Sequence, residues 1–252
     1  MNGPYYIISD NHFSVDLNKK EEERRNKLFQ VLNKIKSLGK GTLIIGGDFF
    51  DYWFEYKDVI PKGYEDILLS LKDLSQSGIE IHYILGNHDF WDFGYLSNQL
   101  GITVHKGDLS IKYNDKNILF THGDGLLKSD YGYRFMKKII RSKIFINIYK
   151  MFPPALTIKL ATQFSKTSAH FNHHPYDKHI KEIKRDLKKF AESKWKNNYD
   201  MIFVGHYHQI GTLEKNKKSL TFLGDWLSKF TVTKLDEDGI WQGNWQNFLE
   251  LS

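Results

Sequence analysis

Short clusters of aspartate, histidine and asparagine follow apolar runs of strand type along this chain. They are Asp10 with His12, Asp48 with Asp51, Asn87 with His88, His122, and His206 with His208. Strand ends at one edge of a sheet lie close together, and ligands of open α/β sheets bind there, so these side chains can share one site. Their oxygen and imidazole donors suit Mn, Fe, Zn or Ni better than calcium. Because they exceed what one ion needs, we expect two ions, bridged by a carboxylate and clamping a phosphate.

Each cluster also has a structural interpretation. A lone histidine at a strand end is more often structural or exposed, and Asn87 can cap a helix. Gly47-Asp48 after an apolar strand is also an ordinary turn. Asp51 can orient a ligand histidine or belong to a turn. The coincidence of so many ligand types at successive strand ends favours the metal site.

Length and composition restrict the protein class. A chain of 252 residues is one large domain or two small ones. It has no cysteine, which excludes disulfides, Cys-zinc sites and a thiol nucleophile. The N-terminus lacks the pattern of a signal peptide, and no apolar run is long enough to span a bilayer. We therefore expect an intracellular, cytoplasmic protein.

The apolar patterns predict the elements that position these clusters. Strands are expected over 5–9, 43–45 and 79–85, and amphipathic helices over 19–38 and 64–74. An acidic start and Gly39 mark the ends of the first helix. This alternation predicts a parallel sheet with helices on its faces. Further strands are expected over 109–113, 117–121, 200–204, 219–223, 230–235 and 240–245, with a helix over 180–191.

Positive charge is concentrated in one segment. The chain carries a net charge of +6, yet residues 126–172 hold nine Lys or Arg and a single acid, Asp130. Such a local excess predicts an anionic partner, whether phosphate, nucleic acid or a membrane face. Helical pieces over 131–141 and 144–152 are both basic and apolar, as in surfaces that bury acyl chains and attract anionic headgroups. A helical cap on the core with solvated lysines is the alternative.

The motifs D-x-H, G-D-x-x-D, G-N-H-D, H-G-D and G-H-x-H occur in this order between Asp10 and His208. The series resembles the calcineurin-like binuclear metallophosphoesterases. The resemblance implies an α/β (α+β) fold, in which helices flank a β-sandwich core. It implies one metal on Asp10, His12, Asp48 and His208, and a second on Asp48, Asn87, His122 and His206. A hydroxide between the ions would attack phosphorus, and His88 would protonate the leaving oxygen or steady the phosphate.

Three further runs, residues 47–53, 122–133 and 223–226, look like the UDP-2,3-diacylglucosamine diphosphatase group. That group cleaves a sugar-linked diphosphate to UMP and 2,3-diacylglucosamine 1-phosphate in lipid A synthesis. The resemblance implies one domain over residues 1–252, with a helical lid inserted at approximately 126–175 that holds the acyl chains. It implies an acylated nucleotide-sugar substrate, Mn²⁺ as the metal, and a peripheral position on the cytoplasmic face of the inner membrane.

The same resemblance implies a set of substrate contacts. They are Asn87, His88, Asp130, Ser168, Asn172 and His206. Ser168 and Asn172 are four residues apart and would share one helical face. Many enzymes of the group have Arg where this chain has His88. Histidine is the general pattern of the superfamily, so the leaving-group chemistry is retained, while branches that act on other substrates also carry G-N-H-D.

Two other functions compete with this hypothesis. One is a binuclear metallophosphoesterase that acts on another phosphodiester, nucleotide or phosphoprotein. The other is a binding protein, either an inactive scaffold or a nucleic-acid binder. No expected ligand is missing, and the basic residues alternate with Ile and Phe instead of stacking aromatics on a sheet. We therefore expect an enzyme without a nucleic-acid partner. A monomer is also expected, although the sequence does not fix the oligomeric state.

Overall fold

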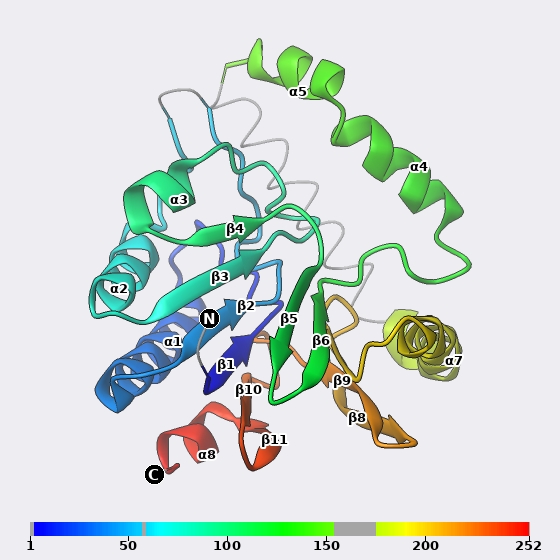
Figure 1. The fold of residues 1–252 in the computed structure, drawn as a ribbon. Coiled ribbons are helices and arrows are strands. Elements are labelled where there is room, and N and C mark those ends of the chain that lie inside the picture. Colours follow the sequence, from blue (N-terminus) through cyan, green and yellow to red (C-terminus); the bar gives the residue numbers. More distant parts are fainter. Residues whose placement is uncertain (1–2, 57–58, 154–174, 252) are drawn as a thin grey trace.

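Two β-sheets pack face to face in the computed structural model, which describes residues 3–56, 59–153 and 175–251 (Figure 1). The first sheet has the strand order β11-β10-β1-β2-β3-β4. Its strands are β1 (Tyr5–Ile8), β2 (Thr42–Ile45), β3 (Glu80–Ile84), β4 (Thr103–His105), β10 (Thr231–Asp236) and β11 (Gly239–Asn244). Strands β1 to β4 are parallel, and β10 runs antiparallel to both β1 and β11.

The second sheet has the strand order β5-β6-β7-β9-β8. Its strands are β5 (Leu109–Tyr113), β6 (Lys116–Thr121), β7 (Met201–Val204), β8 (Ile210–Lys215) and β9 (Lys218–Leu223). The central strands β6, β7 and β9 are parallel, and each edge strand is antiparallel to its neighbour. Apolar side chains of both sheets, among them Ile44 and Phe203, form the core between them.

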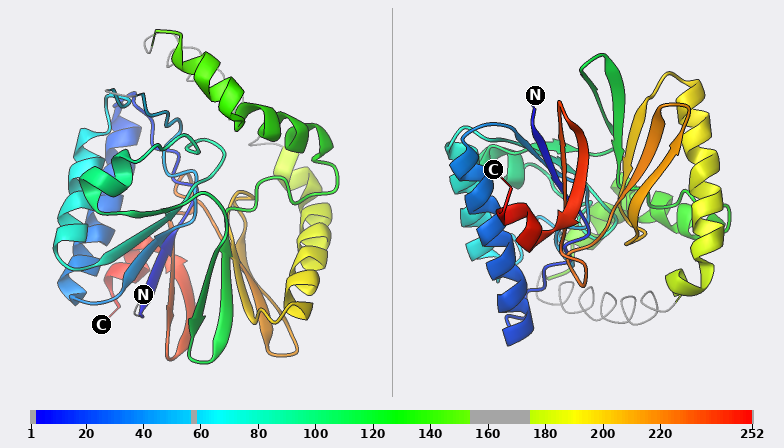
Figure 2. Two further views of the ribbon diagram at one scale, coloured as in Figure 1. Left: turned by 45° about the horizontal axis from the view of Figure 1, so that its top comes forward. Right: turned by 90° about the horizontal axis from the view of Figure 1, so that it is seen from below.

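Helices cover the outer face of each sheet, so the molecule has four layers (Figure 2). Helices α1 (Lys19–Leu38), α2 (Glu65–Gln76), α3 (Tyr95–Leu100) and α8 (Trp245–Leu249) pack on the first sheet. Helix α7 (Pro175–Lys196) packs on the second sheet. This arrangement confirms the predicted mixed α/β class with a sandwich of two sheets.

The ends of α1 follow from its sequence. The Asn18 side chain accepts a hydrogen bond from the Glu21 backbone N–H, which satisfies one free donor at the helix start. Gly39 ends the helix with φ of 69°, a left-handed conformation that suits glycine. The predicted bounds of 19–38 are confirmed. Helix α3, strands β4 and β8, and helix α8 were not predicted, because each is short or has an exposed face.

Helices α4 (Tyr131–Ile140) and α5 (Lys143–Lys150) lie above the strand ends and outside the four layers (Figure 1). They match the two helical pieces predicted for the basic segment. No residue of either helix is buried. Within the described part of the chain, no helix combines the length and apolar character that a membrane span requires.

Candidate metal centre

The candidate ligands follow five parallel strands, β1, β2, β3, β6 and β7, whose carboxyl ends meet at the top of the sandwich. Within the first sheet, the Asp10 N–H donates to the Gly47 carbonyl at 3.0 Å, and the His12 N–H donates to the Asp48 carbonyl at 2.8 Å. Between the sheets, the His206 N–H donates to the Asp10 carboxylate at 2.9 Å. The expected convergence of these loops is therefore present in the fold.

The backbone at these positions is strained. Five of the predicted ligands adopt φ between 46° and 65°, namely Asp10, His12, Asp48, His206 and His208. This left-handed region costs a non-glycine residue about 1–2 kcal/mol. Such strain persists where the surrounding structure fixes it, and it is concentrated at functional sites.

Two glycines let the loops approach each other. A Cβ atom at Gly47 would collide with Nδ1 of His122, and Gly47 also has φ of 99°. A Cβ atom at Gly86 would collide with the Asp48 carboxylate. The glycines of the G-D and G-N-H-D motifs are therefore required by the close approach of side chains from neighbouring loops.

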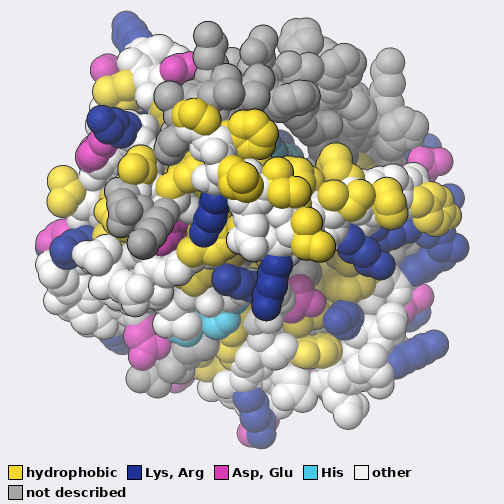
Figure 3. Space-filling model, turned by 90° about the horizontal axis from the view of Figure 1, so that it is seen from above, with side chains coloured by type: hydrophobic (Ala, Val, Ile, Leu, Met, Phe, Trp, Pro, Cys, Tyr) yellow, Lys and Arg dark blue, Asp and Glu magenta, His cyan; other side chains and the backbone are white. Residues whose placement is uncertain are grey.

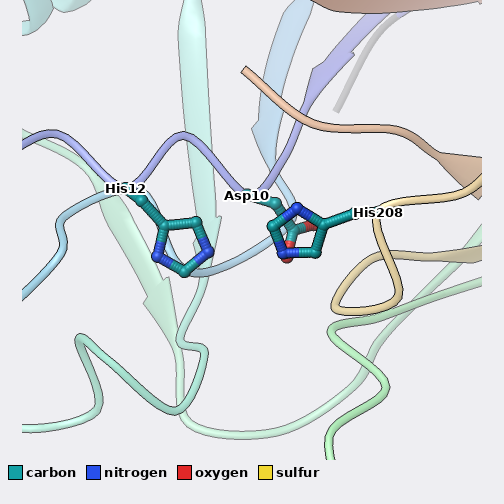
Figure 4. A group of neighbouring side chains, drawn as sticks. All are labelled: Asp10, His12 and His208. Atoms are coloured by element: carbon teal, nitrogen blue, oxygen red, sulfur yellow. The ribbon is translucent and has the colours of Figure 1, made fainter. Parts of the chain in front are cut away.

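A first group of donor atoms comes from Asp10, His12 and His208, whose nearest atoms lie within 4.8 Å of one another. Nε2 of His208 is 3.7 Å from Oδ1 of Asp10. The rings of His12 and His208 are stacked, with centroids 5.4 Å apart. Figure 4 shows His208 beside the Asp10 carboxylate, and the His12 ring on the same side of the backbone.

A second group comes from Asp48, His122 and His206. Nε2 of His122 is 3.3 Å from Oδ2 of Asp48 and 3.2 Å from Oδ1 of Asn87. Oδ2 of Asp48 is also 3.8 Å from Nε2 of His12, which belongs to the first group. Asp48 thus lies between the two groups, where a bridging carboxylate is expected.

His88 lies beside both groups and forms a third cluster with His12 and Asp48. Its backbone N–H donates to Asp48 Oδ1 at 2.8 Å. Its Nδ1 is 2.8 Å from the Asp51 carbonyl, which can only accept, so Nδ1 carries a proton. Oδ1 of Asp51 is 3.7 Å from Nδ1 of His88 and 4.0 Å from Nδ1 of His12. Asp51 therefore has the position of a residue that orients histidines.

Burial and neighbouring charges shift the pKa values of the histidines in different directions. Burial lowers the pKa of His206 to about 3, and burial together with His88 holds the pKa of His12 well below its usual value. Burial also lowers the pKa of His122, but Asp48 outweighs it and raises that pKa to about 10. For the Asp48 carboxyl, His122 and His88 outweigh burial and hold the pKa well below its usual range. Asp48 and His122 therefore form a buried charge pair.

Several residues that hold this site were not identified from the sequence. Asp89 accepts hydrogen bonds from the backbone N–H groups of Phe49 and Gly86, both at 2.7 Å, and so joins two ligand loops. Oδ2 of Asp225 is 3.9 Å from Nδ1 of His208. Arg24 is buried on α1 and donates to the carbonyls of the Asp10–His12 loop. Asp89, inside G-N-H-D, and Asp225, inside the run 223–226, had local motifs that could have signalled their roles.

Of the remaining predicted substrate contacts, one lies just before α4 and two lie outside the described residues. Asp130 precedes α4, and its Oδ2 accepts from the Leu127 N–H at 3.3 Å. Ser168 and Asn172 fall in the range 154–174, outside the described residues. The structure therefore brings together seven of the predicted residues and His88, and leaves these three contacts as predictions.

The donor set suits divalent cations. Asp10 and Asp48 are 0% and 2% exposed, so two carboxylates are buried among imidazoles at one place. Buried carboxylates are stable when they are paired or coordinate metals. Each group offers oxygen and nitrogen donors at separations that small side-chain shifts would close around an ion, as Mn, Fe, Zn and Ni accept. These clusters could hold a pair of divalent metal ions.

Comparison with known proteins agrees with this chemistry. A curated protein of Porphyromonas gingivalis, named UDP-2,3-diacylglucosamine hydrolase, is 28% identical and covers 96% of this chain and 95% of its own length. Proteins with the same name from Haemophilus ducreyi and Neisseria meningitidis are 26% and 24% identical. They cover 93% and 94% of this chain, and 97% and 95% of their own lengths. The model of the calcineurin-like phosphoesterase family matches residues 3–210. The chain therefore belongs to the calcineurin-like phosphoesterases and is a metal-dependent enzyme of that family.

Proposed function

We propose that this enzyme hydrolyses the diphosphate of UDP-2,3-diacylglucosamine to UMP and 2,3-diacylglucosamine 1-phosphate. The observation that carries the proposal is the similarity, at nearly full length in both directions, to several proteins named for this substrate. The likeness extends through the segment above the strand ends and is not confined to the metal motifs. Residues that contact the substrate are expected in that segment.

The two groups of donors divide the metal-binding work. We assign one cation to Asp10, His12, Asp48 and His208, and the other to Asp48, Asn87, His122 and His206. A bound divalent pair activates a water molecule as nucleophile and neutralises charge on the phosphoryl oxygens. Manganese is our choice among the metals that this donor set accepts. Asn87 and His206 would also contact the phosphate.

His88 is suited to supply a proton. Burial lowers its pKa, but Asp48 and Asp51 outweigh burial and raise the pKa above the usual histidine value. Its Nδ1–H is held by the Asp51 carbonyl, which orients the ring and leaves Nε2 for the substrate. A histidine protonated near neutral pH can give its proton to the leaving oxygen or hold the phosphate.

The helices above the site provide an apolar surface. Several of their side chains, and two that follow α5, are largely exposed: Tyr131, Phe135, Met136, Ile139, Ile144, Ile148, Met151 and Phe152. Seen from above, hydrophobic side chains form a band with Lys and Arg beside it (Figure 3). We propose that the segment 126–175 is a lid, that Asp130, Ser168 and Asn172 contact the sugar end of the substrate, and that the band meets acyl chains or the membrane interface.

Release of UMP from UDP-2,3-diacylglucosamine tests the proposal. The purified protein with Mn²⁺ should release UMP and the acylated sugar 1-phosphate in equal amounts, and EDTA should stop the reaction. His88→Gln should lower kcat by about 10²-fold or more, the typical contribution of a general acid. Absence of UMP at micromolar enzyme, with hydrolysis of bis-p-nitrophenyl phosphate intact, would leave the enzyme class in place and remove this substrate.

A second candidate is hydrolysis of a different phosphoester by the same centre. His88, in a position where many diphosphatases of the resembled group carry Arg, favours it. Under this alternative the segment 126–175 is only a shape filter, so its removal should not reduce turnover of a small diester. The ratio of UMP release from UDP-2,3-diacylglucosamine to hydrolysis of the small diester therefore distinguishes the two candidates.

A further inference from the structure

Helix α4 presents opposite chemistry on its two sides. Tyr133, Lys137 and Arg141 follow one another at intervals of four residues, so they lie on one face. Tyr131, Phe135 and Ile139 repeat the same interval on another face, and all three are exposed. The first face contacts the loops of the metal centre, and the second points away from the protein. An amphipathic helix that packs only for stability would bury its apolar side.

Asp124, the last residue of H-G-D, is the point of contact. Its Oδ2 accepts from the Tyr133 hydroxyl at 2.7 Å and lies 2.7 Å from Nζ of Lys137. Nη2 of Arg141 lies 3.3 Å from the same oxygen. Nη2 of Arg141 also donates to the Gly86 carbonyl at 3.0 Å. Arg141 thus joins the loop that carries His122 to the loop that carries Asn87 and His88.

The charges at this contact do not cancel. A single carboxylate, that of Asp124, pairs with two cations, Lys137 and Arg141, whose side chains are 25% and 17% exposed. One positive charge therefore remains beside the metal centre. The Arg141 guanidinium lies 3.9 Å from the centre of the Phe90 ring, which holds its plane. Among the hydrogen bonds of the described residues, the Arg141 side chain donates only through Nη2, so its Nε and Nη1 can donate to a ligand.

We propose that Lys137 and Arg141 bind the second phosphate of a diphosphate whose first phosphate lies at the metal centre. Guanidinium and ammonium groups in this position recognise phosphate oxygens by charge-assisted hydrogen bonds. Arg141 reaches this place from α4 and is held between the Asp124 carboxylate and the Gly86 carbonyl. The inference rests on the proposed function and narrows it, because it makes the enzyme selective for diphosphates over simple phosphodiesters.

The first experiment compares two substrates in the Mn²⁺-loaded enzyme. We measure kcat/KM on UDP-2,3-diacylglucosamine and on bis-p-nitrophenyl phosphate for Lys137→Gln, Arg141→Gln and Arg141→Lys. The kcat/KM for the diphosphate, divided by the kcat/KM for the diester, should fall by at least about tenfold in the Gln variants. Arg141→Lys should recover part of it. Lys138→Gln is the matched control, since Lys138 is the exposed neighbour on the same helix, and its ratio should equal that of the parent.

The second experiment separates this inference from the proposed substrate. UDP-N-acetylglucosamine carries the diphosphate without acyl chains, and UMP carries one phosphate. Both compounds are tested as competitive inhibitors of diester hydrolysis. The inhibition constant of UDP-N-acetylglucosamine should rise by at least about tenfold in Arg141→Gln, while that of UMP should change little. Metal content, measured by mass spectrometry, should stay at the parent value in every variant.

The outcomes decide between the two proposals. Equal losses on both substrates and both inhibitors, or loss of metal, would show that Arg141 only fastens α4 and would overturn the inference. If the parent enzyme releases no UMP from the acylated substrate, yet the selective weakening of UDP-N-acetylglucosamine is observed, diphosphate recognition stands and the proposed substrate fails.

Discussion

The strand-end loops and the α4–α5 pair lie next to each other but differ in which side chains they bury and which they expose. The loops place buried carboxylates among imidazoles and hold five residues in left-handed backbone conformations. Helices α4 and α5 bury no residue and turn large apolar side chains outward. One region is fixed by the core beneath it. In the other, α4 is attached through polar contacts such as Asp124 with Lys137, and α5 packs Tyr149 against a small aromatic cluster that includes Phe54.

This difference suggests that the two regions have different functions. A metal centre needs ligands in one geometry, which a packed core can impose. A surface that receives long acyl chains needs exposed apolar area instead, and such area is unfavourable unless something covers it. We infer that reactivity resides in the loops and substrate choice in α4–α5. The following predictions test that separation.

The largest effect is expected at the shared carboxylate. Asp48→Ala should lower kcat/KM on every phosphoester by more than the roughly 100-fold that loss of an outer-shell partner costs. Bound metal should fall with it, because Asp48 lies between both donor groups. Activity assays on two substrates and metal analysis check this. An Asp48→Ala enzyme that keeps its metals and loses activity on one substrate only would contradict the inference that reactivity resides in the loops.

The same substitution should have different effects on stability in the two regions. Ile44 is fully buried between the sheets, and Ile44→Ala should lower the free energy of unfolding by about 2–5 kcal/mol. Ile139 on α4 is 46% exposed, and Ile139→Ala should change it by no more than about 0.5 kcal/mol. Urea denaturation followed by circular dichroism measures both. Similar losses would mean that α4 is part of the core.

Metal uptake should depend on pH through His122. Its raised pKa of about 10 means that the metal-free site holds a proton there at neutral pH, whereas His206, with a pKa of about 3, does not. Binding must displace this proton, so apparent Mn²⁺ affinity should rise by about tenfold per pH unit below pH 10. The raised pKa also stabilises the metal-free protein at low pH, and this stabilisation is lost as pH rises towards 10. Proton release during Mn²⁺ titration in weak buffer measures the effect, and its absence would contradict the assignment.

The smallest effect is expected on the outer side of α4. Phe135→Ser should raise KM for the diacylated substrate by several-fold. The substitution removes the apolar surface of one exposed side chain that would contact the acyl chains. Deacylated UDP-glucosamine, tested as an inhibitor, should bind the variant and the parent alike. Equal weakening of both ligands would place Phe135 in the headgroup site and not among the acyl contacts.

Much of the fold was accessible from local patterns. The helix 19–38 is predicted because its apolar spacing, acidic start and terminal glycine all agree. The strands that precede the ligand clusters are short and apolar, and they were predicted within one or two residues. Arg24 was not identified, because a guanidinium that holds another loop has no local signature. Asp225 lies in the run 223–226 but was given no role, because His208 approaches it only in the folded chain. Helix α4 was predicted, but not which of its faces points inward.

The amino-acid sequence alone determined which donor atoms this protein has and that they follow successive strands, because ligand types and apolar periodicity are local properties of the chain. Tertiary structure decided which clusters meet. The His206 N–H reaches the Asp10 carboxylate across 196 residues only because the two sheets pack face to face. It also decided that α4 turns its basic face to the metal centre, since that orientation depends on Asp124 and Gly86, which belong to other loops.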